Sequence, residues 1–400
     1  MNKKPTSRIK GSAIALVLFV VIILLIIGAA VLSLGMHSRS MATRAAAEIS
    51  ARCAADAGLV KALFEMNQKL QVKPWDGSNL PSATESLPNC DAFFSYIVTG
   101  DATNGYLIES TGMYGSATEK VRCKLVVRSP FETALFGNRQ ISLKSGTTIS
   151  AYNMPEGKKL KIGTNSILEG MIIARAGVTI DGDVFVGVGG DPNIVINTKN
   201  EAVITGDTYA LTEEYSMPQI AVPQYLADLP SMGNILNSTV LTGLAKCDSI
   251  SLYGGEKLVI DGPVYLYVTG SVTFDNFSEL QIVDATTNPD AYLNLYLGGA
   301  FMLQNGSLIN NNSADPRKLK IYGLNTALMF QFQVDSIFYG AIYAPLANIT
   351  LQNSVEVFGS IITRQLTQQV AANYHYDGQL LVGSPNDEHV KFVVGQWFED

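Results

Sequence analysis

Residues 11–36 read GSAIALVLFVVIILLIIGAAVLSLGM, a stretch without a single charged side chain. Because an α-helix rises ~1.5 Å per residue, a helix of this length exceeds the roughly 30 Å hydrocarbon core of a bilayer. A cleaved secretory signal has a shorter apolar region of about 7–15 residues, followed by a small-residue cleavage site. The stretch therefore predicts one retained transmembrane helix, with membrane lipid as its first partner.

The segment before this span, residues 1–10, is basic and contains no acidic residue. The basic residues after the span are spread over a longer segment and are diluted by Glu48 and Asp56. Because positive charge near a membrane span favours the cytoplasmic side, this asymmetry predicts a cytoplasmic leader and an ectodomain on the other side.

Residues 37–72 predict an amphipathic extension of the same helix, because they are rich in alanine and the first proline after the span is Pro74. Apolar residues recur there at three- and four-residue steps and form one narrow stripe. The stripe consists of Met41, Ala45, Ile49, Cys53, Ala57, Val60 and Phe64. Such a stripe needs cover from a partner helix or from a downstream domain. We expect the sheet that follows in the sequence to cover it.

Residues 73–130 predict a linker and a small antiparallel sheet. The linker KPWDGSNLPSATESLPN has three prolines and no hydrophobic period. The segments FFSYIV, YLIESTGMYG and VRCKLVV then alternate apolar with polar residues and are separated by turns that contain glycine. This pattern is typical of an antiparallel meander.

The N-terminal residues resemble those of a known family. A short basic leader ending in Gly11, a hydrophobic segment, and then ARCAADAGLVKAL resemble the N-terminal region of type IV pilin-like proteins, particularly the PilX-type minor pilins with their A-A-E-A-G-L pattern. The resemblance covers roughly the first 70 residues. It implies a bacterial inner-membrane protein that a prepilin peptidase cuts between Gly11 and Ser12. It also implies that the helix packs among other pilin-like subunits, whereas Leu16 stands where major pilins carry a glutamate.

Residues 131–383 predict a parallel β-helix. Short apolar pairs such as Ile141/Leu143 and Val178/Ile180 recur every five to ten residues, with Gly, Asn, Asp and Thr between them. The alternative is a β-sandwich, which would need longer strands and more hairpin turns. We expect the proline-rich residues 211–247 to run outside the solenoid, and residues 384–400 to form a last strand that caps it.

A second resemblance lies near the C-terminus. The segment FYGAIYAPLANITLQNSVEVFGSIITRQLTQQVAANYHYDGQL is similar to blocks of presumed β-helical structure in bacterial cell-surface proteins that follow pilin-like N-termini. Those blocks have no assigned activity, so the resemblance implies an architecture and no chemistry.

The charge and cysteine content of the chain argue against several kinds of binding partner. The formal net charge is −7, and no basic face is visible in the sequence after the first 52 residues, which argues against nucleic-acid binding. The four cysteines form no C-x-x-C motif, so we expect no metal and no cofactor. A Cys90–Cys123 disulfide and four unpaired thiols are the two alternatives for the cysteines.

The sequence contains no nucleophile, nucleotide or metalloprotease motif. His375 lacks a paired ligand and is interpreted as a packed or turn residue. Asp181 and Asp183 in IDGDV could form the carboxylate pair of a glycosidase or lyase, but Asp-Gly-Asp is also a way to make a tight turn. Aromatic pairs such as Phe330/Phe332 predict stacked rows inside the solenoid rather than an adhesive surface.

The sequence as a whole predicts a structural or adhesive component of a type IV pilus or a related surface apparatus. It would be anchored in the membrane, assemble with pilin-like subunits, and carry a β-helix that meets a surface polysaccharide or a protein ligand. The alternative is a membrane-anchored β-helical polysaccharide-active enzyme, a lyase or a glycosidase.

Overall fold

The computed structural model describes residues 12–399 apart from 103, 334–335 and 353. The predicted leader, residues 1–10, and Gly11 lie outside the described residues. The chain divides into two compact units, which are described separately. Unit 1 comprises Met1–Val126 and Phe392–Asp400, and unit 2 comprises Val127–Lys391.

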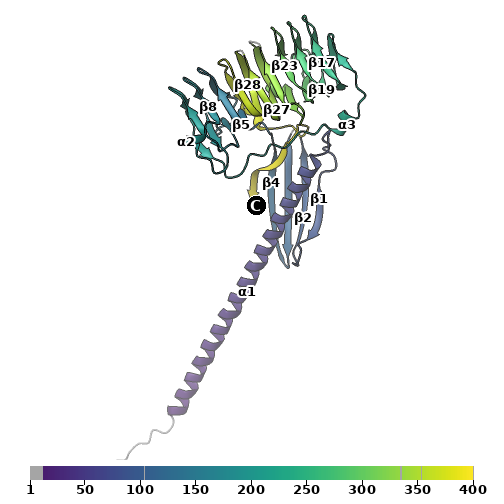
Figure 1. Ribbon diagram of the computed structural model, residues 1–400. Helices are drawn as coiled ribbons and strands as arrows, with labels where there is room; N and C mark the ends of the chain where they lie inside the picture. The colour runs from purple at the N-terminus through teal and green to yellow at the C-terminus, as the bar shows by residue number, and fades with distance from the viewer. Residues whose placement is uncertain (1–11, 103, 334–335, 353, 400) are drawn as a thin grey trace, which may run out of the picture. The chain divides into compact units, whose positions relative to one another are not determined.

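Unit 1 begins with one uninterrupted helix, α1 (Ser12–Lys69), of 58 residues (Figure 1). The predicted span at 11–36 and the predicted extension at 37–72 therefore belong to a single rod. The residues of α1 before Ala51 are largely exposed, whereas a face of its C-terminal part is buried.

The sheet of unit 1 has five strands in the order β1-β2-β3-β4-β30. The first four form the predicted antiparallel meander. Their bounds are β1 (Ser82–Ser86), β2 (Phe93–Asp101), β3 (Gly105–Tyr114) and β4 (Ala117–Arg128). Unit 1 thus has a pilin-like arrangement, a long N-terminal helix packed on a small antiparallel sheet.

The fifth strand corrects the prediction for the C-terminus. Strand β30 (Lys391–Glu399) joins the sheet of unit 1 beside β4 and does not cap the solenoid. The side chains expected to form the cap, Trp397 and Phe398, are exposed. A segment that alternates apolar with polar residues can pair with any open sheet edge. In this structure residues 391–399 pair with the edge of β4.

The helix packs on the sheet through small side chains. Its buried positions are Ala51, Ala54, Ala55, Gly58, Leu59, Ala62 and Met66. A Cβ atom on Gly112 of β3 would lie 2.0 Å from the backbone oxygen of Ala51 and 2.4 Å from the backbone nitrogen of Ala55. The glycine therefore lets the backbones of helix and strand approach each other closely.

The expectation that this sheet covers the apolar stripe of α1 is wrong. Ile49 and Val60 are each 64% exposed, and Met41, Cys53 and Phe64 are exposed as well. The buried face is the alanine-rich one, because small side chains are needed where β3 approaches the helix backbone at Gly112, and Leu59 and Met66 are its two large buried side chains. Ile49, Val60 and Phe64 lie on a different, exposed face of the helix.

Unit 2 is a parallel β-helix, as predicted, and its coils stack three rows of strands. The first row contains β14 (Asn234–Ile235), β17 (Ser249–Leu252), β20 (Val272–Phe274), β23 (Phe301–Leu303), β26 (Met329–Phe332), β8 (Ile172–Ala174) and β11 (Ile196–Thr198). The second contains β16 (Leu244–Cys247), β19 (Pro263–Val268), β22 (Tyr292–Leu297), β25 (Leu319–Gly323), β7 (Lys161–Gly163), β10 (Asp183–Val186) and β13 (Thr208–Ala210).

The third row contains β15 (Thr239–Leu241), β18 (Lys257–Ile260), β21 (Glu279–Ile282), β24 (Leu308–Asn311), β29 (Tyr374–Asp377), β6 (Thr148–Tyr152), β9 (Thr179–Ile180) and β12 (Val203–Ile204). Three longer strands bend around corners and serve more than one row. They are β5 (Leu135–Leu143), β27 (Ser336–Leu351) and β28 (Val355–Gln368). Short helical turns complete the unit: α2 (Pro192–Val195), α3 (Gln224–Ala227), η1 (Pro316–Lys318) and η2 (Gly378–Leu381).

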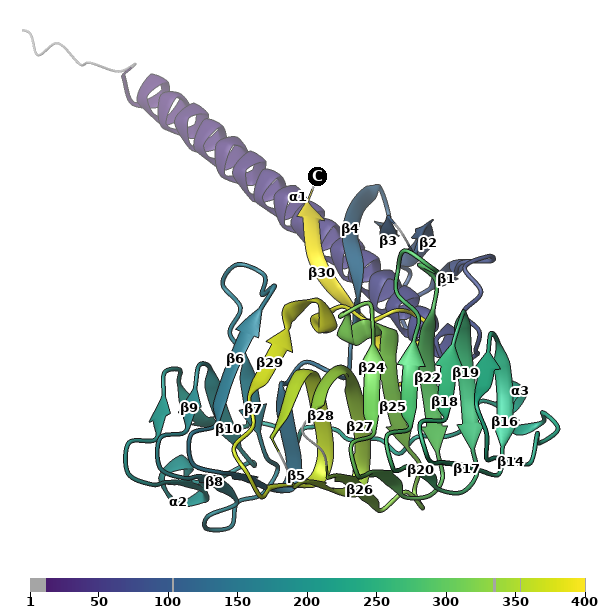
Figure 2. The ribbon, with the colours of Figure 1, turned by 90° about the horizontal axis from the view of Figure 1, so that it is seen from above.

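The coils do not stack in the order of the sequence. The first strand of the solenoid, β5, pairs with β28 on one side and with β7 and β8 on the other. Likewise β6 pairs with β29, and the two lie side by side in Figure 2. The chain therefore enters the solenoid in its middle, builds coils toward one end, and resumes at the other end with β14.

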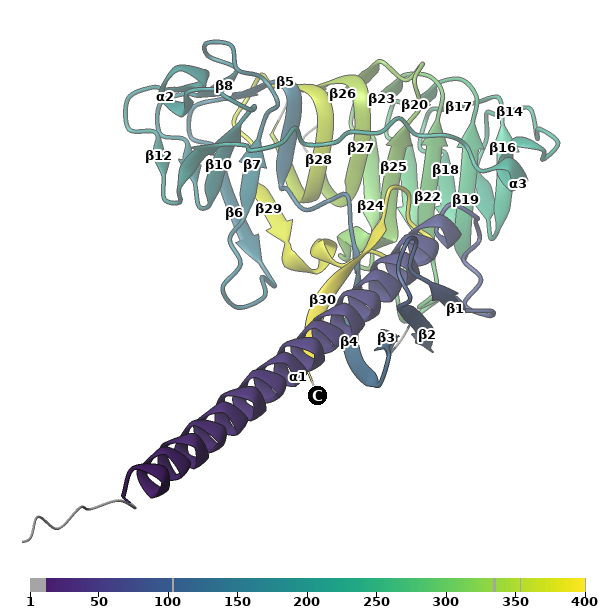
Figure 3. The ribbon, with the colours of Figure 1, turned by 90° about the horizontal axis from the view of Figure 1, so that it is seen from below.

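The crossing segment, residues 211–233, carries the chain between the two ends and runs across the second row of strands (Figure 3). It is shorter than the predicted 211–247, because β14, β15 and β16 already belong to the ladder. Tyr215 stacks on Phe136 with ring centroids 4.4 Å apart, and Tyr343 donates a hydrogen bond of 2.9 Å to the carbonyl oxygen of Pro218. These contacts hold the segment against the solenoid.

The aromatic side chains follow two patterns. Phe274, Phe301 and Phe330 stack inside the solenoid in successive coils, as the sequence predicted. Tyr296, Tyr322 and Tyr343 instead form a ladder on consecutive strands of the second row and are buried.

We predict that Gly112→Ala destabilises unit 1 by ~1–3 kcal/mol, because the new methyl group meets the backbone of α1. Both tryptophans, Trp75 and Trp397, belong to unit 1, so urea unfolding followed by tryptophan fluorescence reports this unit alone. The control is Gly77→Ala, where a Cβ meets its nearest neighbour at an ordinary 3.6 Å. Equal unfolding midpoints for the two variants would contradict the close helix–strand contact.

Candidate functional site

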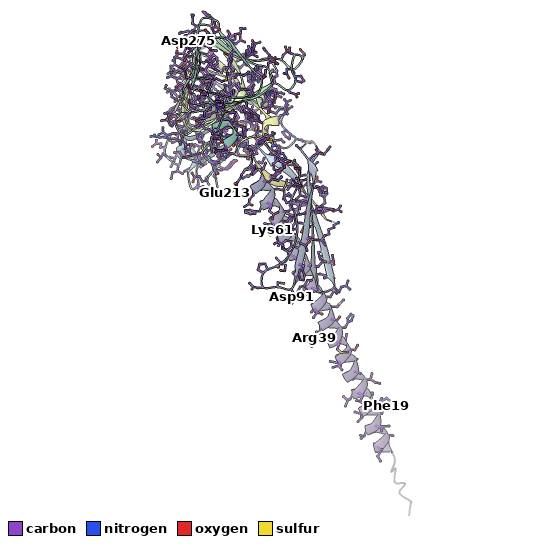
Figure 4. All side chains as sticks on the ribbon, turned by 90° about the vertical axis from the view of Figure 1, so that its right-hand side faces the viewer. Phe19, Arg39, Lys61, Asp91, Glu213 and Asp275 are labelled. Atoms are coloured by element: carbon purple, nitrogen blue, oxygen red, sulfur yellow. The ribbon has the colours of Figure 1, made fainter. Side chains whose placement is uncertain are left out.

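The most conspicuous candidate site is the uncovered surface of α1. In the part of the chain that the structure describes, α1 is the one helix long and apolar enough to cross a membrane, and none of its most apolar segment is buried. Phe19 and Arg39 both project from this uncovered stretch (Figure 4). Leu16 is 64% exposed on the same surface. Ser12 is the first described residue of the helix.

The exposed residues of the stripe extend this apolar surface toward the C-terminal half of the helix, whereas Ala57 is partly buried. The exposed residues are Met41, Ala45, Ile49, Cys53, Val60 and Phe64. Ion pairs lie beside the stripe, with Arg44 and Glu48 3.0 Å apart and Arg52 and Asp56 3.5 Å apart. A surface of this kind can contact lipid tails or the apolar side chains of a neighbouring helix, because both provide non-polar cover.

The cysteines are free, so the predicted alternative of a Cys90–Cys123 disulfide is not present in the structure. Cys123 is buried on β4, and Cys90 is exposed in the turn before β2. The two residues bracket the meander in sequence, but alternation along β4 points Cys123 into the core.

The carboxylates of Asp181 and Asp183 make bonds between coils. Thr205 donates a hydrogen bond of 2.8 Å from Oγ1 to Asp181, and the backbone N–H of Asp207 donates one of 2.9 Å to Asp183. Lys159 Nζ lies 3.5 Å from Asp183, and this carboxylate and that of Asp207 raise the pKa of the lysine above its ordinary value. The Asp-Gly-Asp segment therefore ties adjacent turns together.

His375 lies in a stack of rings on the third row. Its ring centroid is 4.5 Å from that of Phe358, which is in turn 4.5 Å from that of Tyr339. The imidazole nitrogens lie 3.1 Å from Ser150 Oγ and 3.0 Å from Glu356 Oε1. His375 is thus a packed residue. No group of three His, Cys, Asp or Glu that could hold a metal occurs among the described residues.

Sequence reasoning missed one cluster of surface cations. Lys144, Arg175 and Lys199 lie in different coils, and the strand register places them next to one another at one corner of the solenoid. A search for a basic run along the sequence cannot find them. Aligning the short apolar pairs of successive coils with one another would have placed these three cations at equivalent positions.

A family model described as "Domain of unknown function (DUF7305)" matches residues 238–381. The comparison with curated proteins found no match.

Two solved structures show a low similarity. The competence-associated pilin ComZ from Thermus thermophilus is 12% identical, with a TM-score of 0.25, over 88% of this chain and 97% of the pilin. An ice-binding protein from the Antarctic ascomycete Antarctomyces psychrotrophicus is 14% identical, with a TM-score of 0.24, over 62% of this chain and 95% of that protein. Similarities this low establish no function.

We predict that Cys53 and Cys90 react with a maleimide at pH 8, whereas Cys123 and Cys247 react only after unfolding. Burial raises the pKa of the Cys123 thiol to about 11 and that of Cys247 to about 12, so both remain protonated at pH 8 and shielded from the reagent. Peptide mass spectrometry of the labelled native protein measures the pattern. An oxidised Cys90–Cys123 peptide pair, or fast labelling of Cys123, would contradict it.

Proposed function

We propose that the protein is a membrane-anchored, minor-pilin-like component of a type IV pilus or a related surface apparatus, with a structural or adhesive role. The observation that carries the proposal is the half-covered helix α1. Its C-terminal part has a packed alanine-rich face, whereas no described residue of the chain covers its most apolar stretch. A helix with that distribution needs a non-polar environment supplied from outside.

The proposal assigns two environments to the same apolar surface. In the bacterial inner membrane, with the N-terminus in the cytoplasm, residues 14–36 span the bilayer and contact lipid. In an assembled filament, helices of other pilin-like subunits replace the lipid. The exchange is feasible because apolar side chains gain no large hydrophobic free energy in leaving lipid, so close packing decides the balance.

The alternative of a β-helical polysaccharide lyase or glycosidase has less support. Its candidate pair was Asp181 and Asp183, and both carboxylates accept hydrogen bonds from the next coil. A glycosidase needs two carboxyl groups that face one another across a substrate bond. The observed bonds favour the structural role.

We predict that the mature protein begins at Ser12, as the resemblance of the leader to prepilin leaders implies. Mass spectrometry of the N-terminal peptide from purified membranes measures this directly. Gly11→Leu should leave the leader attached, because the bulky side chain replaces the residue before the cut. A wild-type chain that retains the leader would exclude prepilin-type processing and reduce the proposal to a simple membrane anchor.

We further predict that the stripe contacts other subunits in the membrane. In a Cys90→Ser background, the exposed Cys53 is labelled with a maleimide–benzophenone, which on illumination links the label to C–H bonds of any residue nearby. We expect a covalent adduct with a second pilin-like subunit, identified by mass spectrometry. Ile49→Lys should reduce the adduct at least several-fold, because a charged side chain disrupts apolar helix packing.

The matched control for this experiment is Leu168→Lys in unit 2, because Leu168 is 62% exposed and Ile49 is 64% exposed. This control should leave the adduct unchanged. Both variants should still sediment with membranes, since neither changes the span. An adduct that Ile49→Lys leaves intact would contradict the role of the stripe.

A further inference from the structure

Three cations stand in line at the corner of the solenoid between the first and third rows of strands. Lys144 follows β5, Arg175 follows β8 and Lys199 follows β11. The backbone N–H of Arg175 donates to the carbonyl oxygen of Leu143 at 3.4 Å, and that of Lys199 donates to the carbonyl oxygen of Ala174 at 2.8 Å. The three residues therefore occupy the same position in successive coils, at a spacing of ~4.8 Å between neighbouring strands. We call them the cationic row.

The turns that carry the cationic row are themselves stacked. The backbone N–H of Gly146 donates to the carbonyl oxygen of Ala176 at 3.1 Å, and that of Gly177 donates to the carbonyl oxygen of Asn200 at 3.2 Å. The buried Gln368 accepts hydrogen bonds at Oε1 from the Lys144 backbone N–H and from Thr147 Oγ1. The backbone is therefore fixed, and the cationic side chains leave it from equivalent positions.

The charges of the cationic row are not neutralised within the described part of the chain. None of the three side chains has a carboxylate within 4.0 Å, and the one acidic residue in their turns is Glu201. Like charges directly opposite one another on adjacent strands are destabilising. The chain has a net charge of −7, so a row of three neighbouring cations is unusual in it. An external anion would reduce the repulsion between these cations.

The same corner continues as a row of amides in the neighbouring coils. Each of four glutamines donates its backbone N–H to the carbonyl oxygen of a residue in the preceding coil at 2.8 or 2.9 Å, so the four extend the line of the cationic row. They are Gln369, Gln352, Gln333 and Gln304. Their side chains are at least partly exposed. The amide row ends at Asp275, which follows the neighbouring strand β20. The corner thus offers cations at one end and neutral hydrogen-bonding groups beside them.

We propose that this corner binds a linear acidic polysaccharide that lies along the solenoid axis. Carboxylate groups of the polysaccharide contact the cationic row, and its hydroxyl groups exchange hydrogen bonds with the amide row. This proposal names a ligand class for the adhesive role proposed above. It rests on that proposed function because it requires the β-helix to lie outside the cell. Nucleic acid fits less well, because a sugar–phosphate backbone presents few or no free hydroxyl groups that could exchange hydrogen bonds with the amide row, and it places a phosphate near Asp275.

The test uses the full chain in detergent micelles and measures binding to polygalacturonate by isothermal titration calorimetry. Dextran serves as the neutral polysaccharide, and single-stranded DNA serves as a different polyanion. We expect binding to polygalacturonate that weakens as salt rises, and no measurable binding to dextran. The triple variant Lys144→Gln/Arg175→Gln/Lys199→Gln should bind about tenfold more weakly or not at all, because exposed ion pairs are lost.

The matched control removes three exposed cations elsewhere, as Lys124→Gln/Lys158→Gln/Lys391→Gln, so its net charge equals that of the triple variant. It should bind like the wild type. Equal loss in both variants, or no binding by the wild type, would overturn the proposal, and DNA binding as tight as that of polygalacturonate would overturn the polysaccharide assignment. None of these outcomes depends on filament assembly, which the cross-linking of Cys53 tests separately.

Discussion

The pairing of the first coil of the solenoid with its last coil constrains the rest of unit 2. Strands β5 and β28 lie in one parallel ladder, so the chain enters and leaves the β-helix at the same place. Arg128 and Val382 accordingly form an antiparallel bridge, and the N–H of Gly383 donates to the carbonyl oxygen of Val127 at 3.0 Å. Because entry and exit are adjacent, the solenoid is an insertion between β4 and β30 of one sheet. The C-terminal strand therefore returns to unit 1 and does not form a solenoid cap.

The same pairing explains the crossing segment and the buried tyrosines. A chain that starts in the middle must travel the length of the solenoid once, and it does so over the second row of strands. The row beneath carries large aromatic rings. The Tyr343 hydroxyl donates to the carbonyl oxygen of Pro218 in the crossing segment, whereas the hydroxyls of Tyr296 and Tyr322 bond Glu388, which lies between η2 and β30. Burial raises the pKa of Tyr215 to about 12, and it also holds the pKa of Tyr322 and Tyr343 well above the ordinary value. The crossing segment thus acts as an outer layer of the core in this unit.

Local sequence patterns predicted the elements but not their long-range partners. The uncharged run at 11–36 specified the helix, the alternating segments specified the meander, and the short apolar pairs specified the β-helix. The order of the coils could not be predicted, because a coil with inward Ile and Val fits any neighbour of the same shape. The cationic row was missed for the same reason, since its members become neighbours only through the register. The packed face of α1 was misassigned because hydrophobicity was weighed above side-chain size, and Gly112 makes size decisive.

That misassignment bears on function, because the sheet leaves the larger apolar side chains of α1 uncovered. Had the sheet packed on Ile49, Val60 and Phe64, the part of the helix after residue 36 would present mainly small and charged residues to its surroundings. Instead the alanine face supports the sheet, and the stripe continues the apolar surface of residues 14–36 without a break in the helix. Burying apolar area releases about 25 cal/mol per Å² of free energy, so covering a continuous apolar stripe favours association with another non-polar surface. One helix can then pack on its own sheet and also associate with other apolar surfaces, because the two faces that do this differ in the size of their side chains.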